Sequence, residues 1–536
     1  MTFAWNYGDI LDGVATIVPV GQAALIHGSR QTSWSAFTMR TNNLARNLLA
    51  NGAQPGDKIA FYMRNCAEYS EAIAAAFKAG LTHVNVNYRY IENELVYLLD
   101  NSDATVVIYG TEFAPQVEKI RDRLPLVKQW IEVSGKGSDP KNEYESLVTQ
   151  GDGKALGIER STDDMLFLYT GGTTGMPKGV MWRHADLWAA TGGGGDPARG
   201  VPPPQDLDGY LRLIEAGEPP VNLALPPLMH GTGLLASIGA MTHGGTTVTL
   251  DSKNFEAKLA LQAIDDFGVT ATSIVGDAFA RPMLEVLNSS PGKYSLASLR
   301  TITSSGVMWT SEIKAGLLKH QSELTLSDRF ASSEALGMGG SIMTKDASVE
   351  VAKFVLGPDT RVFTEEYDEV VPGSGVSGMV AVKGPLPVGY YKDQEKTDKT
   401  FPVIQGDRYS MPGDWAIVEV DGSLTLLGRG SNCINTAGEK VFPEEVEEAL
   451  KFHESIADAL VVGLADDKWG QAITAVVQMH EGYELDEVEL KSYTRQHLAA
   501  YKLPKNIFAK ADLERAPNGK ADYPAIKAYA EKMAGK

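Results

Sequence analysis

Apolar and polar residues follow two different periods in the first third of the chain. Segments 35–51 and 68–80 carry apolar residues at helical spacing, and the second of them ends at a glycine. Segments 58–62, 104–109 and 165–168 are short apolar or β-branched runs, which are typical of buried strands. Strands that alternate with helices predict parallel sheets with helices on both faces. We therefore predict an α/β fold.

The alternation continues after residue 221, with a helix predicted over 255–267 and strands over 271–275 and 299–305. Segment 192–220 departs from this pattern, because it begins with four glycines and contains three successive prolines. Such a composition predicts a long excursion over the surface. It is either a tolerated insertion or a cover over a ligand cleft, and the sequence does not decide between them.

The pattern changes again after Asp414. Segment 422–429 has the alternation of a hairpin arm, and a compact unit of helices and strands follows it. We predict a domain boundary there, with a large domain of parallel or mixed sheets over residues 1–429 and a small α+β domain over 430–536. The elements predicted in the small domain are helices at 443–452 and 485–497 and strands at 459–463 and 473–478.

Composition narrows the possible environment and partners. The chain has 536 residues, of which 43% are hydrophobic and 22% charged, as in ordinary globular proteins. A net charge of −19 argues against extended binding to nucleic acids or anionic membranes. The only cysteines are Cys66 and Cys433, no signal peptide is visible, and the least charged stretch, 221–250, is interrupted by prolines and glycines. We therefore expect a cytoplasmic protein without an integral membrane segment. Its oligomeric state, including a homodimer, stays open.

The most informative stretch runs from Tyr169 to Val180 and has the sequence Tyr-Thr-Gly-Gly-Thr-Thr-Gly-Met-Pro-Lys-Gly-Val. Glycines let backbone N–H groups approach an anion closely, and threonine hydroxyls and a lysine add further donors. The order differs from a Walker loop, since a proline precedes the lysine. The stretch predicts a polyphosphate site made of Thr170, Gly171, Gly172, Thr173, Thr174, Gly175 and Lys178.

This stretch closely resembles the phosphate-binding signature of the adenylate-forming enzymes, which include acyl-CoA synthetases, peptide-synthetase adenylation domains and firefly luciferase. Further motifs of that family follow in order over residues 20–525. The resemblance implies ATP, Mg²⁺ and CoA as cofactors and a mobile C-terminal domain. It also implies that Glu334 and Thr174 hold Mg²⁺, a hard cation that prefers oxygen ligands.

The resemblance assigns further residues to the nucleotide. Asp328-Arg-Phe-Ala-Ser-Ser-Glu334 corresponds to a family element that normally reads Tyr-Gly-x-Thr-Glu, so Phe330 would stack on adenine and Ser333 would keep the hydroxyl. Asp414 would accept hydrogen bonds from ribose. For Glu334 and Asp414 the structural alternatives are a helix-start carboxylate and a turn aspartate. The nucleotide-binding residues implied in this way are Ser305, Gly306, Phe330, Ala331, Ser333, Asp414, Arg429 and Lys520.

The residues expected to bind the carboxylic acid and those of the C-terminal domain also match motifs of the family. The element that ends in Met229-His230-Gly231 borders the family's acyl pocket, and the resemblance adds Val275, Gly276 and Val307 to its lining. Asp277 either pairs with Arg281 one helical turn on or touches the substrate. In the small domain, Ser431 occupies the family's hinge position, although the usual residue there is Asp or Lys. Gly438 would guide the CoA thiol and Lys520 would be the adenylation lysine.

These motifs imply an ATP-dependent acid–CoA ligase. A carboxylate attacks the α-phosphorus of ATP to give acyl-AMP and pyrophosphate, and the CoA thiol then displaces AMP. Lys520, Glu334, His230 and Thr174 would be the catalytic residues. The open pocket glycines suit a medium-chain, long-chain or polycyclic acid. The alternatives are a luciferase-like enzyme, a stand-alone amino- or aryl-acid adenylating enzyme, and a non-catalytic nucleotide sensor. An amino-acid substrate is disfavoured, since no aspartate lies near His230 to bind an amine.

Overall fold

The computed structural model describes residues 5–133, 143–170, 176–195, 200–307, 309–346, 353–436, 439–466, 470–498, 500–516 and 519–535. The chain forms two compact units. The first consists of Met1–Val351 and Lys383–Ser410, and the second of Ala352–Val382 and Met411–Lys536. The domain boundary that we predict at residue 430 falls inside the second unit, at the end of a strand, and it remains a prediction.

One sheet of the first unit has seven strands in the order β18-β8-β7-β4-β3-β5-β6. Strands β6, β5, β3, β4 and β7 run parallel, whereas β8 pairs antiparallel with β7 and with β18. The bounds are β3 Lys58–Tyr62, β4 Thr82–Asn85, β5 Ala104–Gly110, β6 Gln129–Val133, β7 Met165–Thr170, β8 Lys178–Arg183 and β18 Gly389–Tyr390.

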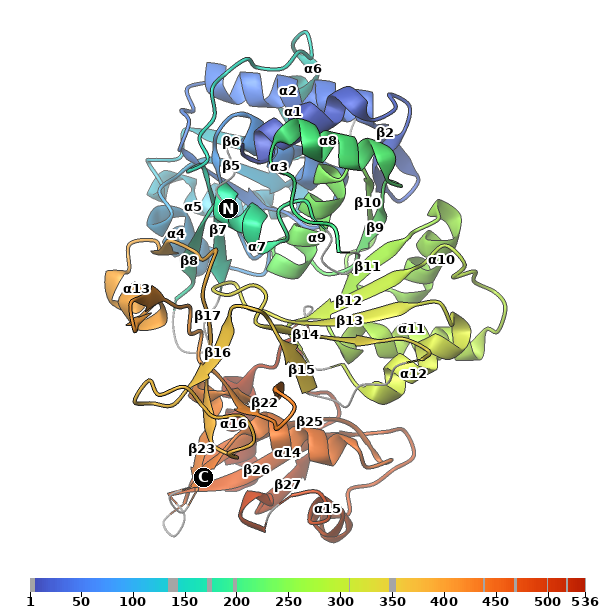
Figure 1. Ribbon diagram of the computed structural model, residues 1–536, viewed down its shortest axis with the longest axis vertical. Coiled ribbons are helices and arrows are strands. Elements are labelled where there is room, and N and C mark those ends of the chain that lie inside the picture. The colour runs from blue at the N-terminus through green and yellow to red at the C-terminus, as the bar shows by residue number, and fades with distance from the viewer. Residues whose placement is uncertain are drawn as a thin grey trace. The chain divides into compact units, whose positions relative to one another are not determined.

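Helices cover both faces of this sheet (Figure 1). Ile59 and Phe61 of β3 share a core with α1, α2 and α3, while Ala60 and Tyr62 share another with α4 and α5. This alternation is the two-residue period of a strand that is buried on both faces. The bounds are α1 Tyr7–Ile17, α2 Trp34–Ala50, α3 Ala67–Lys78, α4 Glu92–Asn101, α5 Ala114–Ile120, α6 Glu143–Thr149 and α7 His184–Ala190.

A second sheet of the first unit has the strand order β14-β13-β12-β11-β9-β10-β1-β2, with parallel pairing from β13 to β1 and antiparallel pairs at both ends. Its strands are β1 Ala23–His27, β2 Arg30–Ser33, β9 Val221–Ala224, β10 Thr246–Thr249, β11 Ala271–Ile274, β12 Thr301–Ser305, β13 Thr325–Phe330 and β14 Gly339–Met343. Helices α10 Ala257–Phe267, α11 Asp277–Ser289 and α12 Ser311–His320 pack on one face, and α9 Gly231–Thr242 shares the core of α1 and α3. The first unit also contains α13 Gln394–Thr400, β19 Val403–Ile404 and β20 Asp407–Arg408.

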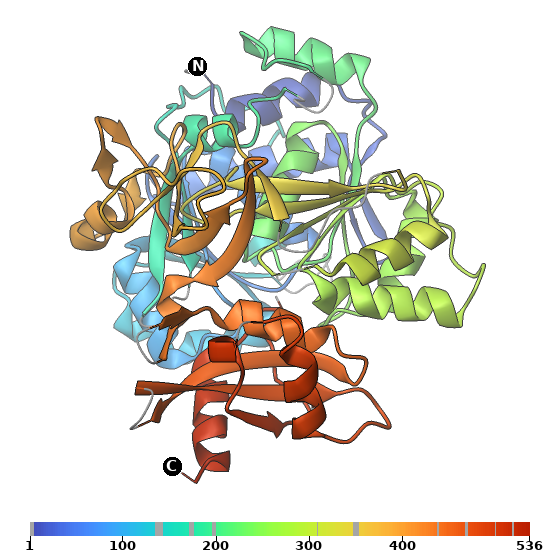
Figure 2. The ribbon, with the colours of Figure 1, turned by 60° about the horizontal axis from the view of Figure 1, so that its bottom comes forward.

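The second unit contains two sheets. One has the order β16-β17-β21-β22-β15, and the other joins β24, β23, β26, β25 and β27. In the latter, Leu460 and Val462 face α16 while Ala459 and Val461 face α14 and α15, and Figure 2 shows α14 and α16 on opposite sides of the strands. The bounds are β15 Lys353–Leu356, β16 Thr360–Phe363, β17 Ser377–Val382, β21 Asp414–Val418, β22 Ser423–Arg429, β23 Ile434–Thr436, β24 Glu439–Val441, β25 Ile456–Asp466, β26 Gly470–Met479, β27 Asn506–Ala509, α14 Pro443–Lys451, α15 Glu487–Thr494 and α16 Tyr523–Met533.

The structure confirms the α/β fold and each predicted element, with bounds that shift by a few residues. We predicted a long surface excursion without a regular element over 192–220, and this needs correction, because Leu207–Ala216 forms helix α8 against α1 (Figures 1 and 2). Asp206 caps this helix, since its carboxylate accepts a hydrogen bond from the Gly209 N–H at 2.6 Å. The flanking glycines and prolines concealed a helical spacing of apolar residues at 207, 210, 211 and 214.

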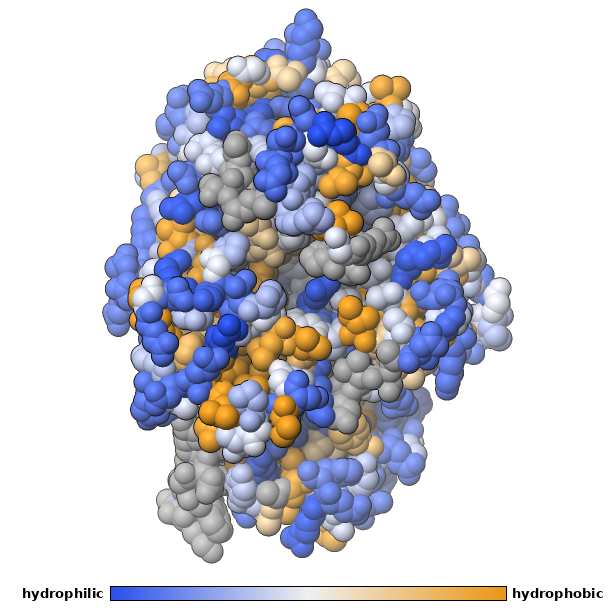
Figure 3. Space-filling model, in the orientation of Figure 1, coloured by the Kyte–Doolittle hydropathy of each residue, from blue (hydrophilic) through white to orange (hydrophobic). Residues whose placement is uncertain are grey.

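The surface agrees with the composition. Figure 3 shows hydrophilic residues over much of one face, with hydrophobic residues scattered among them. Among the helices that the structure describes, none has both the length and the apolar content for crossing a bilayer.

Candidate active site

The predicted phosphate site lies where two paired strands of the first unit end. Strand β7 ends at Thr170 and β8 begins at Lys178, and these two residues are opposite each other in the antiparallel register. Gly171, Gly172, Thr173, Thr174 and Gly175 lie outside the described residues. The structure therefore fixes the two strand ends from which this segment departs.

Lys178 has a partner that sequence reasoning missed. Its ammonium forms an ion pair with Asp393, the residue that caps α13. The bond from Lys178 lowers the pKa of Asp393, with smaller contributions from the backbone and the charge of Lys396. To bind a phosphate, the Lys178 ammonium must either break its ion pair with Asp393 or contact both groups at once. Asp393 lies two residues after the Gly389-Tyr390-Tyr391 motif, which is the signal that could have found it.

Asn85, at the end of β4, connects the phosphate strand to the acid-binding motif. Its amide nitrogen donates to the carbonyls of Tyr169 at 2.9 Å and Met229 at 2.7 Å, and its oxygen accepts from the Tyr169 N–H at 2.6 Å. The side chain is buried, so each of these bonds is shielded from water. Asn85 therefore fixes the start of the glycine-rich segment relative to the turn before His230. No sequence pattern singled it out.

The predicted adenine and metal residues follow β13. Phe330 is the last residue of that strand and is buried, while Ala331, Ser333 and Glu334 lie in the loop after it. Residue Trp182 of β8 donates its indole N–H to the Ser333 carbonyl at 2.9 Å. This bond ties the loop to the strand that begins at Lys178.

Glu334 is held at both its backbone and its side chain. Tyr390 donates its hydroxyl to the carboxylate at 2.8 Å, and Ser410 donates to the backbone carbonyl at 2.7 Å. No helix begins at Glu334, so the helix-start alternative for this carboxylate is wrong. Within the described residues no group of three or more His, Cys, Asp or Glu side chains could hold a metal. A single oriented carboxylate nevertheless fits Mg²⁺, which takes few protein ligands when substrate phosphates supply the others.

His230 stands at the N-cap of α9, after a turn in which its N–H donates to the Pro227 carbonyl at 3.0 Å. Met229 is buried, and its sulfur accepts a hydrogen bond from the Tyr88 N–H at 3.2 Å. Beside them, a Cβ added to Gly231 would meet no atom within 4 Å. Open space therefore adjoins His230 on the helix side.

The other predicted pocket residues lie at the ends of β11 and β12. Ser305 is the last residue of β12, and Val307 packs against the core beneath the sheet. Gly276 and Gly306 both have positive φ, +54° and +93°, and the Gly276 N–H donates to the Ser304 hydroxyl at 2.9 Å. Because these glycines satisfy a backbone requirement, their presence says little about pocket width. Val275 is buried directly before Gly276.

Asp277 pairs with Arg281, which is the structural one of the two alternatives that we considered for this residue. Its carboxylate accepts from Arg281 at 3.2 Å, one helical turn on, and from the Thr310 N–H at 3.1 Å. The ion pair with Arg281 is thus confirmed, and Asp277 organises the start of α11.

In the second unit, two predicted nucleotide residues meet across a β-ladder. Asp414 and Arg429 are opposite each other in the β21–β22 register, and their side chains form an ion pair of 3.4 Å. Asp414 begins a strand, so the turn-aspartate alternative is wrong. Burial and the charge of Asp414 raise the pKa of Glu444, whose carboxylate accepts from the Arg429 N–H at 3.5 Å. Glu444 thus joins α14 to the end of β22.

Lys520 lies at the end of a tight turn that precedes α16, and the residue is exposed. Within this turn the Ala516 N–H donates to the Lys520 carbonyl at 2.9 Å, and the Gly519 N–H donates to the Ala516 carbonyl at 2.7 Å. Arg515 anchors the turn, because it donates to the Gly519 carbonyl at 3.3 Å and to both oxygens of Asp458 on β25, at 2.5 and 2.8 Å.

Two further predictions concern the connection within the second unit. Ser431 lies in the short 3₁₀ segment Gly430–Asn432 directly after β22. Its role as a hinge remains a prediction. Gly438, between β23 and β24, lies outside the described residues.

Family models and known proteins both match this chain over most of its length. The model of the AMP-binding enzyme family matches residues 14–391, and that of the AMP-binding enzyme C-terminal domain matches 445–520. A medium/long-chain-fatty-acid–CoA/3-oxocholest-4-en-26-oate–CoA ligase of Mycobacterium marinum is 39% identical, over 98% of this chain and 96% of the relative. A 3-oxocholest-4-en-26-oate–CoA ligase of Rhodococcus rhodochrous is also 39% identical, over 97% and 95%.

Solved structures agree on the fold. The anthranilate CoA ligase AuaEII in complex with anthranoyl-AMP superposes with a TM-score of 0.85 at 20% identity, covering 100% of this chain and 99% of that one. ATP-bound MatB from Rhodopseudomonas palustris gives a TM-score of 0.82 at 21% identity, covering 99% and 100%. With a family model that spans most of its length and relatives that match it almost end to end, this chain belongs to the AMP-binding enzyme family.

Proposed function

We propose that this protein is an AMP-forming acid–CoA ligase for medium-chain to long-chain fatty acids and bulky, ring-bearing acids. One observation carries the proposal: relatives that are 38–39% identical over nearly their whole length are named as ligases for such acids. The hydrogen bonds that hold the Glu334 carboxylate and the turn before His230 in the first unit support the same chemistry.

In the first half-reaction, a carboxylate oxygen forms a bond to the α-phosphorus of ATP, and the bond from that phosphorus to the bridging oxygen breaks to release pyrophosphate. Both reactants are anions, so positioning and charge stabilisation supply most of the catalysis. We assign Lys520 to the charge at the α-phosphate and Lys178 to the outer phosphates. Glu334 and Thr174 would hold Mg²⁺, which neutralises phosphate charge when bound. Tyr390 keeps the Glu334 carboxylate oriented for that role.

In the second half-reaction, the CoA sulfur forms a bond to the acyl carbon and AMP leaves. Lys520 is needed only in the first step. We therefore propose that the small domain turns about Ser431 between the steps, so that Gly438 replaces Lys520 beside the acyl-AMP. Asp414 and Arg429 would contact the ribose. Arg515 holds the Gly519 carbonyl, one residue before Lys520, through its bonds to Asp458 of the same unit, which suits a residue that must enter and leave the site.

Two broader expectations accompany this proposal. The reaction has small-molecule partners, namely the acid, ATP and CoA, and we propose that it takes place in the cytoplasm. A homodimer is a further proposal, which light scattering on the purified protein can test.

The direct experiment incubates purified protein with ATP, Mg²⁺, CoA and a panel of acids from acetate to palmitate, together with a steroid side-chain acid. Mass spectrometry quantifies AMP and acyl-CoA. We expect equal amounts of AMP and acyl-CoA, with kcat/KM rising from acetate to octanoate. A protein that prefers acetate or propionate over every larger acid, or that forms no acyl-CoA, would refute the proposal.

A further inference from the structure

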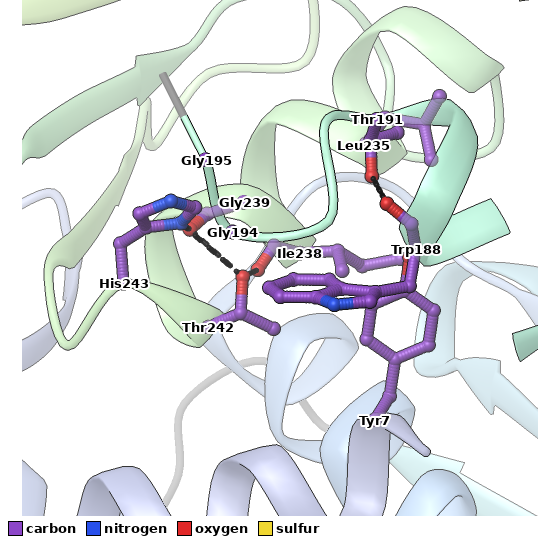
Figure 4. Close-up of a pocket in the computed structure, with 10 residues that line it drawn as sticks. All are labelled: Tyr7, Trp188, Thr191, Gly194, Gly195, Leu235, Ile238, Gly239, Thr242 and His243. Carbon is purple, nitrogen blue, oxygen red and sulfur yellow. Dashed lines mark hydrogen bonds between the residues drawn. The ribbon is translucent and has the colours of Figure 1, made fainter. Parts of the chain in front are cut away.

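A pocket of ≈ 180 Å³ lies in the first unit beside α9 (Figure 4). Tyr7, Trp188 and Thr191 are among the residues that line it, and none of the lining residues is predicted to bind ATP or the acid. Among the described residues that line it there is no lysine, arginine or carboxylate. The pocket therefore offers no charge that could bind a polyphosphate, in contrast to the ion pair of Lys178 with Asp393.

The position of Asp393 beside Lys178 follows from backbone pairing. Strand β18 pairs antiparallel with β8. The pairing continues beyond β18, because the Tyr391 N–H donates to the Gly179 carbonyl at 2.8 Å. The residues after Tyr391 therefore lie beside Lys178, which is the first residue of β8. The sheet thus places both partners of the ion pair.

Side-chain contacts fix the two residues before Asp393. Asp103, at the turn before β5, accepts hydrogen bonds from the Tyr391 hydroxyl at 2.7 Å and from the Lys392 ammonium at 2.8 Å. The Tyr391 ring also packs on Phe167 of β7, with centroids 4.9 Å apart. These contacts hold the backbone on the N-terminal side of Asp393.

The two oxygens of the Asp393 carboxylate have different partners. Oδ1 accepts a hydrogen bond from the Lys396 N–H at 2.9 Å and caps α13, whereas Oδ2 binds the Lys178 ammonium. The side chains of Lys178 and Asp393 are 40% and 26% exposed, so the pair is accessible from solvent. The bond from Lys178 lowers the pKa of Asp393, which therefore stays ionised at neutral pH.

The same short segment also contacts the predicted metal residue. Tyr390, three residues before Asp393, donates its hydroxyl to the Glu334 carboxylate at 2.8 Å. Segment 389–393 therefore contacts both Glu334 and Lys178, which we assign to Mg²⁺ and to the outer phosphates. Asp393 thus lies where its charge can affect phosphate binding.

We propose that Asp393 is the counter-ion that Lys178 exchanges for the outer phosphates of ATP and recovers when pyrophosphate leaves. The inference rests on the proposed function, in which Lys178 binds those phosphates. Asp393 acts through Lys178 and is a positioning residue rather than a catalytic one. Its carboxylate opposes tight retention of pyrophosphate, because both anions compete for one cation.

This competition sets the size of the effect. An ion pair of this exposure changes an equilibrium constant by a factor of up to about five. Removing the Asp393 charge should therefore strengthen the binding of ATP and of pyrophosphate by about two- to fivefold each. AMP lacks the outer phosphates, so its affinity should stay unchanged. A general loss of structure would instead weaken the binding of all three ligands.

The experiment measures the binding of ATP with Mg²⁺, of pyrophosphate with Mg²⁺, and of AMP to the full chain by isothermal titration calorimetry. Asp393→Asn removes the charge but keeps an amide oxygen that can cap α13, and Asp393→Ser, which also suits a helix cap, is the second variant. Asp407→Asn is the matched control, because it breaks a partly exposed ion pair with Lys383 in the same unit. Thermal unfolding of each variant checks its fold.

A double-mutant cycle tests whether the effect depends on Lys178. In the Lys178→Met background, Asp393→Asn should change the affinity for ATP and for pyrophosphate by less than about twofold. Tighter binding of both ligands by the single variant, together with the loss of this effect in the Lys178→Met background, supports the proposal. Unchanged or weaker binding of ATP or pyrophosphate overturns it, as does an equal change for AMP or an effect that persists without Lys178.

The binding measurements need no acid, so this inference and the proposed function can fail separately. A wild type that binds ATP but forms no acyl-CoA overturns the proposed function, and the calorimetry still decides the role of Asp393. A wild type that binds neither ATP nor pyrophosphate overturns both.

Discussion

Replacing Asp458 by Asn tests whether an ion pair positions Lys520 for adenylation. Asp458 binds Arg515 through two charge-assisted hydrogen bonds, and Arg515 in turn holds the Gly519 carbonyl one residue before Lys520. Asn is nearly isosteric but removes the charge and one of the two acceptors. Arg515 is then left without its counter-charge, and the turn loses its anchor on β25.

The magnitude follows from the burial of the pair. Both side chains are about one-fifth exposed, at 20% and 23%, so solvent screens the pair only in part. Removing one partner of a buried pair costs about 3–5 kcal/mol, and this partly exposed pair belongs near the lower limit. A displacement of ~1 Å of a catalytic group costs on the order of 10² in rate. We therefore expect acyl-AMP formation to fall by roughly 10- to 10²-fold, which is less than complete loss of Lys520.

The assay separates the half-reactions. Pyrophosphate release with octanoate and ATP reports adenylation, and octanoyl-CoA formation from supplied octanoyl-AMP reports thioester formation. Glu445→Gln is the matched control, because it breaks a comparably exposed ion pair with Lys502 in the same unit. Asp458→Glu retains the charge and should restore part of the adenylation rate.

An Asp458→Asn enzyme that loses both half-reactions equally would show that the pair has only a structural role. An unchanged adenylation rate in a correctly folded variant would show that the turn is held by its backbone bonds alone. Thermal unfolding of the full chain distinguishes these cases from misfolding.

Three further variants test other contacts. Asn85→Asp removes the two amide N–H donors that bond the carbonyls of Tyr169 and Met229. Because lost buried hydrogen bonds cost about 1–3 kcal/mol each, we expect at least a tenfold loss of adenylation and a lower Tm. An unchanged adenylation rate would contradict this role. Burial raises the pKa of Glu447 from its usual 4.5 to about 8. Between these two pH values the folded state binds a proton that the unfolded state has lost, so the stability of the wild type should fall as pH rises through this range. Glu447→Gln should flatten this slope and raise the Tm at pH 9, and a lower Tm there would refute the reasoning. Gly276→Ala should destabilise the protein by about 1–3 kcal/mol through its positive φ, whatever acid is used, and chemical denaturation measures this cost.

The sequence predicted the fold well where local pattern and tertiary role agree. Strand β3 has the predicted bounds, and the hairpin arm at 422–429 forms β22 against β21. Helix α8 was missed because its glycine- and proline-rich surroundings indicate a loop, whereas burial of Tyr210 against α7 and α9 stabilises a helix. Local composition carries no information about such a contact.

In the candidate site, too, some residues are predicted by motifs and others are identified only by the structure. Motifs named Lys178, Glu334 and Lys520, because each carries a charge that the chemistry needs. Other residues position the motifs: Asn85 joins the phosphate strand to the turn before His230, and Asp458 anchors Arg515 beside Lys520, both through hydrogen bonds between segments far apart in the chain. Neither has a distinctive local pattern, so only the structure identifies them. Gly276 illustrates the opposite case, since a glycine that suggested a wide pocket is explained by backbone geometry.

The central claim is that one chain performs two reactions and uses Lys520 in only the first. Single-turnover kinetics of Lys520→Ala with octanoate and ATP, and separately with octanoyl-AMP and CoA, test it most directly. We predict that acyl-AMP formation falls by a factor on the order of 10² to 10³ while thioester formation from octanoyl-AMP stays within a few-fold of wild type. An equal loss in both half-reactions would contradict the claim.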